Sequence, residues 1–197
     1  ANSPACAGGL VATIGGSSMI ANAAALGDVS VTGVSAEYNW CRAGGLLGSS
    51  AYLTHNCYAS GNVSLQDSAE SVKNVYLGCL IGEQSGGVVV SGHYFNGAVL
   101  RCNGETQTAK ATGSIPSSWY FDYNKITAHD SVTDAAFAAA MNDGISESGI
   151  AETDAYLTSS GKFTSYTAES LAAMRPAAWQ SWGLADGKVV LGGSQDD

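Results

Sequence analysis

The side chains of this chain best suited to acid–base or metal chemistry are its three histidines, His55, His93 and His129. A neutral imidazole binds zinc and exchanges protons near neutral pH. The strand pattern described below places His55 and His93 two positions apart on neighbouring turns of the chain, so their rings could approach each other. A metal would also need a carboxylate partner, and no carboxylate recurs at that position. We therefore expect ordinary surface or ladder histidines, with no metal and no cofactor.

Catalytic nucleophiles and paired carboxylates do not stand out in the sequence. It has no Gly-x-Ser-x-Gly nucleophile elbow. The residues that follow three recurring glycines are Asp28, Asn62 and Ala98, so the acidic character is not maintained from one to the next. Glycoside hydrolysis needs two carboxylates roughly 5 to 9 Å apart, and the sequence indicates no such pair. We expect no catalytic residues and no enzymatic activity.

Aromatic side chains form the third group with chemical potential, because a flat ring can stack on a sugar ring. The candidates for ligand binding are Tyr38, Trp40, Trp119 and Tyr120. The alternative is that these rings pack in the core or in a cap, since alternation along a strand turns about half of a run such as 119–123 inward.

The five cysteines are Cys6, Cys41, Cys57, Cys79 and Cys102. No two of them form a Cys-x-x-Cys pair, so the sequence does not indicate a zinc site or a thioredoxin-like redox site. Disulfides are plausible if the protein is exported. Because five is odd, we expect one or two bridges and at least one free thiol, with Cys57 as a buried residue.

A regular spacing determines where these residues lie. Leu10, Leu46 and Leu80 are 36 and 34 residues apart, and Gly27, Gly61 and Gly97 are 34 and 36 apart. A period in this range is typical of stacked repeats, in which each repeat buries its apolar face on the next. The boundaries that we expect are 7–33, 34–66 and 67–102, with a partial repeat at 119–127.

The apolar residues within each interval favour strands. They are rich in valine and alternate with polar residues, as in Val29-Ser30-Val31 and Val63-Ser64-Leu65. We expect Leu10, Leu46 and Leu80 to form one interior ladder, and Val29, Val63 and Val99 another. The predicted fold is mainly β, a right-handed parallel β-helix (β-solenoid) of about three to four coils, because parallel crossovers are right-handed by default. The stretches 34–42 and 67–75 are expected to be connectors, and 103–118 is a polar, glycine-containing stretch in which Pro116 should break regular pairing.

Two elements of the middle interval carry a family resemblance: Gly45-Leu46-Leu47-Gly48 and Asn56-Cys57-Tyr58-Ala59-Ser60-Gly61. They resemble the GLUG motif of bacterial secreted and cell-surface proteins. The first interval departs from the motif at Ala12, and the third has Gly92-His93-Tyr94 for Asn-Cys-Tyr. The resemblance implies a parallel β-helix within a large adhesin-like polypeptide, which would be secreted or displayed at the cell surface. We expect this chain to be one segment of such a polypeptide.

Residues 128–197 differ in character and are expected to form an α/β cap packed on the solenoid, which would occupy 1–127. An alanine-rich stretch at 133–141 predicts a helix with a capping box at Ser131 and a stop at Gly144. A second helix is predicted at 167–175. The run 188–191 predicts a final strand after the turn at Asp186-Gly187.

Charge excludes two classes of partner. The net charge is −9, and eight basic residues over 197 positions cannot form a phosphate-binding face. Nucleic acid and anionic membrane surfaces are therefore not expected, and no apolar run reaches the roughly 20 residues of a membrane helix. The preferred hypothesis is an adhesin-like stalk or binding module for host or microbial glycans, mucin or matrix proteins. The alternatives are a polysaccharide lyase or glycoside hydrolase domain, and a purely structural spacer.

Overall fold

The computed structural model describes residues 5–15, 19–34, 40–50, 53–67, 74–85, 88–115, 125–146, 148–149, 151, 155 and 180–193. The chain divides into two compact units, 1–131 and 132–197. The protein is mainly β, with parallel sheets, as the sequence predicts.

The described residues of the first unit form fifteen strands. In chain order they are β1 (Ala5–Gly8), β2 (Val11–Ile14), β3 (Met19–Ala25), β4 (Val29–Val34), β5 (Trp40–Gly44), β6 (Leu47–Ser50), β7 (Leu53–Ala59), β8 (Val63–Asp67), β9 (Asn74–Gly78), β10 (Ile81–Gln84), β11 (Val88–Phe95), β12 (Leu100–Cys102), β13 (Glu105–Gln107), β14 (Thr112–Ser114) and β15 (Ile126–His129).

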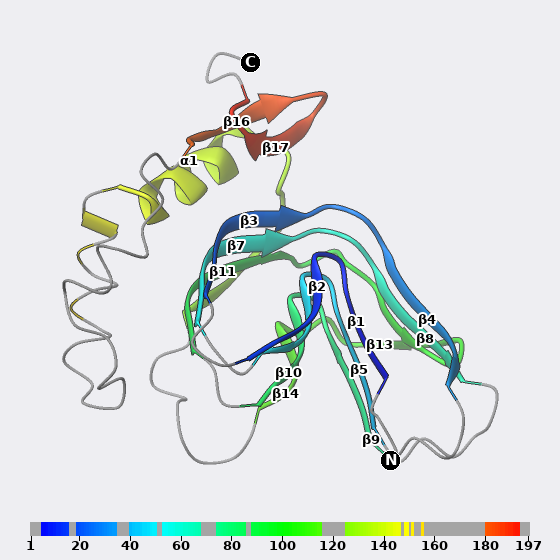
Figure 1. Cartoon of the computed structure of the whole chain (residues 1–197). Coiled ribbons are helices and arrows are strands. Elements are labelled where there is room, and N and C mark those ends of the chain that lie inside the picture. Colours follow the sequence, from blue (N-terminus) through cyan, green and yellow to red (C-terminus); the bar gives the residue numbers. More distant parts are fainter. Residues whose placement is uncertain are drawn as a thin grey trace. The chain divides into compact units, whose positions relative to one another are not determined.

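These strands form four sheets with a constant pairing rule. Each strand from β1 to β8 pairs in parallel with the strand four places later, which gives the orders β1-β5-β9, β2-β6-β10, β3-β7-β11 and β4-β8-β12. β14 and β15 extend the second and third sheets by the same rule, while β13 pairs antiparallel with β12. Figure 1 shows β3, β7 and β11 side by side, and β4 beside β8. Residues 31 to 37 positions apart therefore become neighbours.

The predicted leucine ladder is confirmed in its backbone and corrected at one side chain. The Leu10 N–H donates to the Leu46 carbonyl at 3.0 Å, and the Leu46 N–H donates to the Leu80 carbonyl at 2.9 Å. Leu46 and Leu80 are fully buried, but Leu10 is 46% exposed. Leu10 lies between β1 and β2, which are the outermost strands of their sheets, so no described strand covers it.

The predicted valine ladder is wrong at its third member. Val29 pairs with Val63, but Val63 pairs with Leu100 rather than with Val99. Between the pairs Tyr94–Ala59 and Leu100–Val63 the chain is two residues longer on the side of β11 and β12, and the Val99 carbonyl instead accepts from the Val63 N–H at 3.0 Å. Leu100 is fully buried in place of Val99.

Two apolar cores hold the sheets together. The first joins the sheet of β1, β5 and β9 to that of β4, β8 and β12; the second joins the sheet of β2, β6 and β10 to that of β3, β7 and β11. Fully burying each Val, Leu or Ile side chain contributes about 1.5–3 kcal/mol. The first core contains Val29, Cys41, Ala43, Val63, Leu65, Leu77, Cys79, Ala98 and Leu100. The second contains Ile14, Ala25, Leu46, Leu47, Cys57, Ala59, Leu80, Ile81 and Val89.

Glycine is required where the first sheet bends into the second. A Cβ on Gly44 would overlap the Leu47 carbonyl oxygen and lie 2.5 Å from the Gly82 nitrogen. A Cβ on Gly82 would lie 2.6 Å from the Ala43 nitrogen, because the strand after the bend packs against the backbone of the strand before it. This close approach of two backbones is the physical reason for the recurrent glycines on either side of the leucines.

A bulge distinguishes the third sheet. Asn22 and Asn56 adopt φ of 51° and 48°, and the buried Asn56 amide donates to the Asn22 side-chain oxygen at 2.9 Å. β11 has no residue at this position, because Ser91 pairs with His55 and the next residue, Gly92, pairs with Cys57. From Ser91 onward β11 therefore alternates simply, although it has an extra residue of its own, Val90, between the pairs Val89–Thr54 and Ser91–His55.

In the second unit, helix α1 (Ala135–Gly144) packs against a hairpin of β16 (Trp182–Ala185) and β17 (Lys188–Leu191). The helix begins later than predicted: Asp134, not Ser131, is the N-cap, and its carboxylate accepts from the Phe137 N–H at 2.8 Å. The final strand is confirmed, with Asp186 and Gly187 at φ of 52° and 67° as a type I′ turn requires. The predicted helix at 167–175 lies outside the described residues.

Both predicted connectors are corrected in part. Residues 40–42 belong to β5 and residues 74–75 to β9, while 35–39 and 68–73 lie outside the described residues. The stretch 103–118 contains β13 and β14, which sequence reasoning missed.

Candidate functional site

Of the four aromatic candidates, Trp40 is the one that the structure describes; Tyr38, Trp119 and Tyr120 lie outside the described residues. Trp40 is the first residue of β5 and is 40% exposed, one of the large hydrophobic side chains that the described surface presents to solvent.

Strand alternation in β5 builds a polar and aromatic outer face. Cys41 and Ala43 are fully buried in the first core, so Trp40 and Arg42 point to the opposite side of the sheet. Arg42 pairs in register with Tyr76 of β9. The rings of Trp40 and Tyr76 lie 5.7 Å apart between centroids at 54°, and the Arg42 guanidinium carbon lies 5.5 Å from the Trp40 centroid. This distance is within the range of a cation–π contact.

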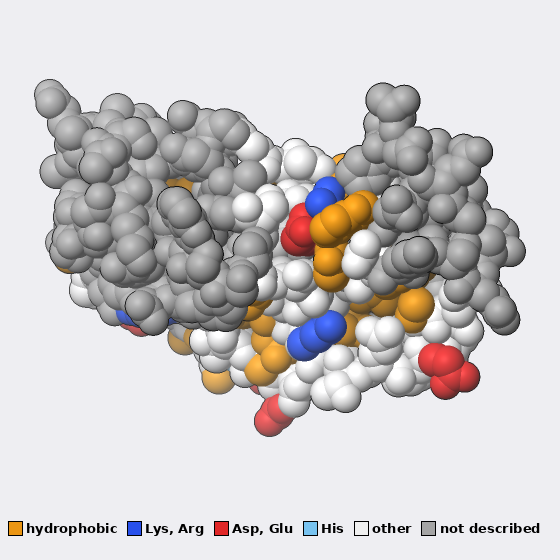
Figure 2. All heavy atoms as spheres, turned by 90° about the horizontal axis from the view of Figure 1, so that it is seen from below, with side chains coloured by type: hydrophobic (Ala, Val, Ile, Leu, Met, Phe, Trp, Pro, Cys, Tyr) orange, Lys and Arg blue, Asp and Glu red, His pale blue; other side chains and the backbone are white. Residues whose placement is uncertain are grey.

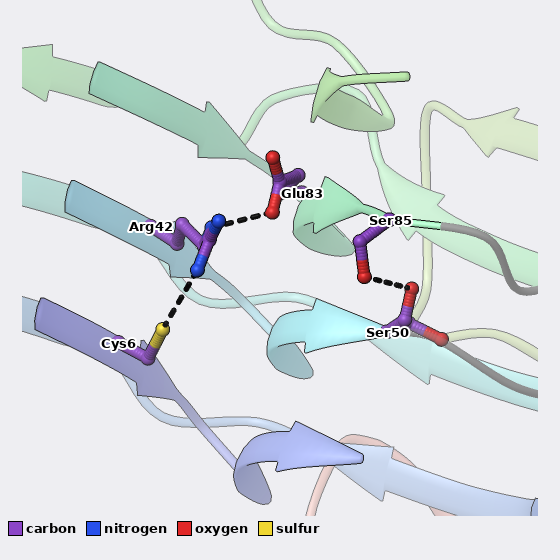
Figure 3. Close-up of polar contacts among 5 residues, drawn as sticks. All are labelled: Cys6, Arg42, Ser50, Glu83 and Ser85. Carbon is purple, nitrogen blue, oxygen red and sulfur yellow. Dashed lines mark hydrogen bonds and ion pairs between the residues drawn. The ribbon is translucent and has the colours of Figure 1, made fainter. Parts of the chain in front are cut away.

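A carboxylate from the neighbouring sheet completes the cluster. Glu83 of β10 forms an ion pair through Oε2 with Nε of Arg42. The side chains of Arg42 and Glu83 are 19% and 10% exposed. Arg42 Nη1 also contacts the sulfur of Cys6 at 3.9 Å, and Cys6 is its register partner on β1. Figure 3 shows Arg42 between Cys6 and Glu83, with the ion pair joining two sheets. We call Trp40, Arg42, Tyr76 and Glu83 the Trp40 face.

The Trp40 face combines an aromatic surface with the ion pair of Arg42 and Glu83. A guanidinium carries five N–H donors in a planar fork, and the ion pair and the sulfur contact use only part of it. The second oxygen of Glu83 adds an acceptor. Figure 2 shows an acidic and a basic side chain in contact beside hydrophobic groups, on a described surface where charges are sparse. Such a face can stack a ring and hydrogen-bond its hydroxyl groups.

The predicted placement of His55 and His93 two positions apart on neighbouring strands is confirmed, and His129 joins them from β15. His93 lies against His129, with Nδ1 of the first 2.9 Å from Nε2 of the second and ring centroids 5.1 Å apart. Nε2 of His93 lies 3.2 Å from the Ser91 hydroxyl oxygen. His55 stands opposite Ser91 in register and is 3% exposed. Sequence reasoning missed Ser91 and His129; the signals were the i, i+2 spacing of Ser91 and His93 and the 36-residue offset to His129.

Burial and neighbouring imidazoles change the acidity of His93. Burial is the main cause that lowers the pKa of His93 to about 4, and the positive charge that His129 and then His55 can carry lowers it further. His93 is therefore neutral at neutral pH. In the described part of the chain, no group of three or more His, Cys, Asp or Glu side chains has the geometry to hold a metal ion.

The cysteines correct the prediction of one or two bridges, because none of the five forms a disulfide. Parallel register explains this: Cys41 faces Ala5 and Val75, Cys6 faces Arg42, and Cys57 faces Ala23 and Gly92, so no cysteine is paired across a sheet with another. The burial predicted for Cys57 is confirmed, and burial raises its pKa to about 12. Such a thiol is unreactive at neutral pH.

The residues after the recurring glycines have a structural role. The Asp28 carboxylate accepts from the Asn62 N–H at 2.8 Å, and the Asn62 side-chain oxygen accepts from the Val99 N–H at 2.9 Å. Both side chains therefore bind the backbone of the next turn of chain.

Comparison of the chain with protein-family profiles, curated proteins and solved structures finds no match. None of the described helices is long and apolar enough to cross a membrane.

Proposed function

We propose that this chain is a glycan-binding module built on a GLUG-type β-solenoid, secreted or displayed at a bacterial surface as part of an adhesin-like polypeptide. The proposed β-solenoid is supported by the pairing of each strand with the strand four places later. After every four strands the chain therefore returns to the same sheet. Right-handed winding is the default for parallel crossovers, and three to four coils accommodate β1 to β15.

The observation that carries the binding function is the Trp40 face. An exposed tryptophan beside a tyrosine, with an ion-paired Arg42 and Glu83 next to it, matches what a sugar requires: a flat apolar surface for the ring carbons and charged hydrogen-bonding groups for the hydroxyls. The ligand class is a hydroxyl-rich glycan, as carried by mucins and matrix proteins. The net charge of −9 disfavours strongly anionic glycans at long range.

Binding of the purified chain to a glycan and matrix-protein array, with and without calcium, tests the proposal. We expect hits that Trp40→Ala weakens by about tenfold or more, since a buried aromatic contact contributes more than about 1 kcal/mol to binding. Leu10→Ala is the matched control, because Leu10 is a comparably exposed hydrophobic residue outside the Trp40 face. Equal binding by wild type and Trp40→Ala would refute the assignment of the site, and a blank array would favour the structural spacer.

A further inference from the structure

We propose that Ser91, His93 and His129 form an acyl-transfer site that hydrolyses esters, with Ser91 as the nucleophile, His93 as its general base and His129 as a positioning residue. This activity is separate from glycan binding at the Trp40 face.

The missing bulge residue in β11 creates the nucleophile–base pair. Because β11 passes directly from Ser91 to Gly92, Ser91 and His93 alternate normally and lie on the same face of the sheet. Gly92 points to the opposite side, where a Cβ would meet Val89 and Leu80 of the second core. The Ser91 hydroxyl oxygen is 3.2 Å from Nε2 of His93, at the limit for a hydrogen bond between a nucleophile and its base. Ser91 is partly exposed, so its oxygen is not sealed in a core.

The third residue comes from the adjacent strand and fixes the proton positions. β15 pairs with β11 so that His129 lies opposite Phe95, and Nε2 of His129 comes within 2.9 Å of Nδ1 of His93. One arrangement of protons serves a general base: Nδ1–H of His93 donates to His129, and Nε2 of His93 accepts from the Ser91 hydroxyl. In a catalytic triad, too, a third group orients the general base by accepting a hydrogen bond from its other ring nitrogen.

The protonation state of His93 agrees with the geometry. Its pKa is lowered to about 4, first by burial and then by His129 and His55, so the ring is neutral and can accept a proton above that pH. A base of such low pKa is weaker than one near neutral pH. A neutral imidazole in the third position also stabilises the charged base less than a carboxylate does. We therefore expect slow turnover on activated esters.

The reaction balances without a cofactor. The Ser91 oxygen forms a bond to the ester carbonyl carbon as its proton passes to Nε2 of His93. The ester C–O bond then breaks, and the leaving alcohol takes the proton from His93. Water, deprotonated by His93, attacks the acyl-serine; the acid leaves, and the proton returns to Ser91. The substrate class is a small-acyl ester, of which the acetyl esters on glycans are one example.

Labelling with a fluorophosphonate probe, followed by peptide mass spectrometry, tests the proposal on the whole chain. We expect a phosphonyl adduct on Ser91 and slow hydrolysis of p-nitrophenyl acetate. Ser91→Ala should abolish both signals, and His93→Gln should slow labelling by about 10²-fold, the lower range for loss of a general base. Ser64→Ala is the matched control, a partly buried serine on β8, and should label like wild type.

Dependence on pH separates a positioning residue from a structural one. Labelling by the wild type should be lost at low pH as His93 takes up a proton near pH 4. His129→Gln should move this midpoint to higher pH, because the charge that lowers the pKa of His93 is removed. A folded wild type that leaves Ser91 unlabelled, or labelling of equal rate in His93→Gln, overturns the proposal. Labelling of Ser91 requires no glycan, so failure of the glycan site and failure of this proposal are distinguished.

Discussion

Replacing Gly44 with alanine should destabilise the first unit far more than replacing a glycine that lies in open space. An added Cβ at Gly44 meets three backbone atoms: it overlaps the Leu47 oxygen and lies 2.5 Å from the Gly82 nitrogen and 2.8 Å from the Ile81 Cα. Backbone atoms of two paired strands cannot rotate away, as the end of a flexible side chain would. Overpacking of this kind costs about 3 kcal/mol or more, at the upper end of the usual range.

Gly27→Ala provides the matched control. A Cβ at Gly27 meets nothing within 4 Å, and the residue is exposed. Its substitution should change stability little, or stabilise by about 0.4–1 kcal/mol through the reduced freedom of the unfolded chain.

Urea denaturation followed by circular dichroism measures the difference. With a denaturant dependence of about 2 kcal/mol per molar, the midpoint of Gly44→Ala should fall by about 1.5 M relative to wild type. A fall of less than about 0.5 M, or a fall equal to that of Gly27→Ala, would refute the argument that backbone approach requires glycine at this bend.

Two further predictions concern buried titratable groups. In the folded protein the pKa of His93 is about 4, below its ordinary 6.5, so the unfolded chain binds the proton more readily. The free energy of unfolding should therefore be constant above about pH 7. It should fall by on the order of 3 kcal/mol between about pH 6.5 and pH 4. Urea midpoints measured across this pH range should fall in the wild type and fall less in His93→Gln. An equal pH dependence of the midpoint in both proteins would contradict the lowered pKa of His93. Thiol titration at pH 8 without reductant should detect five thiols in urea, while in the native protein Cys57, Cys41 and Cys79 react much more slowly than the partly exposed Cys6 and Cys102. A total below five in urea would show that a disulfide forms.

The sequence by itself determined which residues become neighbours along the leucine positions, and that the protein is mainly β with parallel sheets. Leu46 and Leu80 sit next to glycines that a tight bend requires, and both signals are local and recur at nearly constant spacing. The burial of Cys57 and the Asp186-Gly187 turn were also readable, because each depends on residue type and immediate neighbours.

Only the tertiary structure decided the composition of the two candidate sites. The sequence predicts that Trp40 belongs to a connector, because Trp-Cys-Arg has no strong strand signal. In the structure Trp40 is the first residue of β5, because β9 pairs with it. Thr112–Ser114 is a strand for the same reason: β10 supplies the hydrogen bonds that three small polar residues would not form alone. Strand formation of this kind depends on the partner more than on intrinsic propensity.

Register decided the remaining contacts. Two extra residues between the pairs Tyr94–Ala59 and Leu100–Val63 put Leu100 in the core, and the absence of a residue opposite Asn56 places Ser91 and His93 on the same face, next to His129. A shift of one residue turns every later side chain to the other face of its sheet. The sequence predicts the repeat spacing only to within a residue or two. Which side chains share a face of a sheet depends on single residues that are inserted or omitted between paired positions.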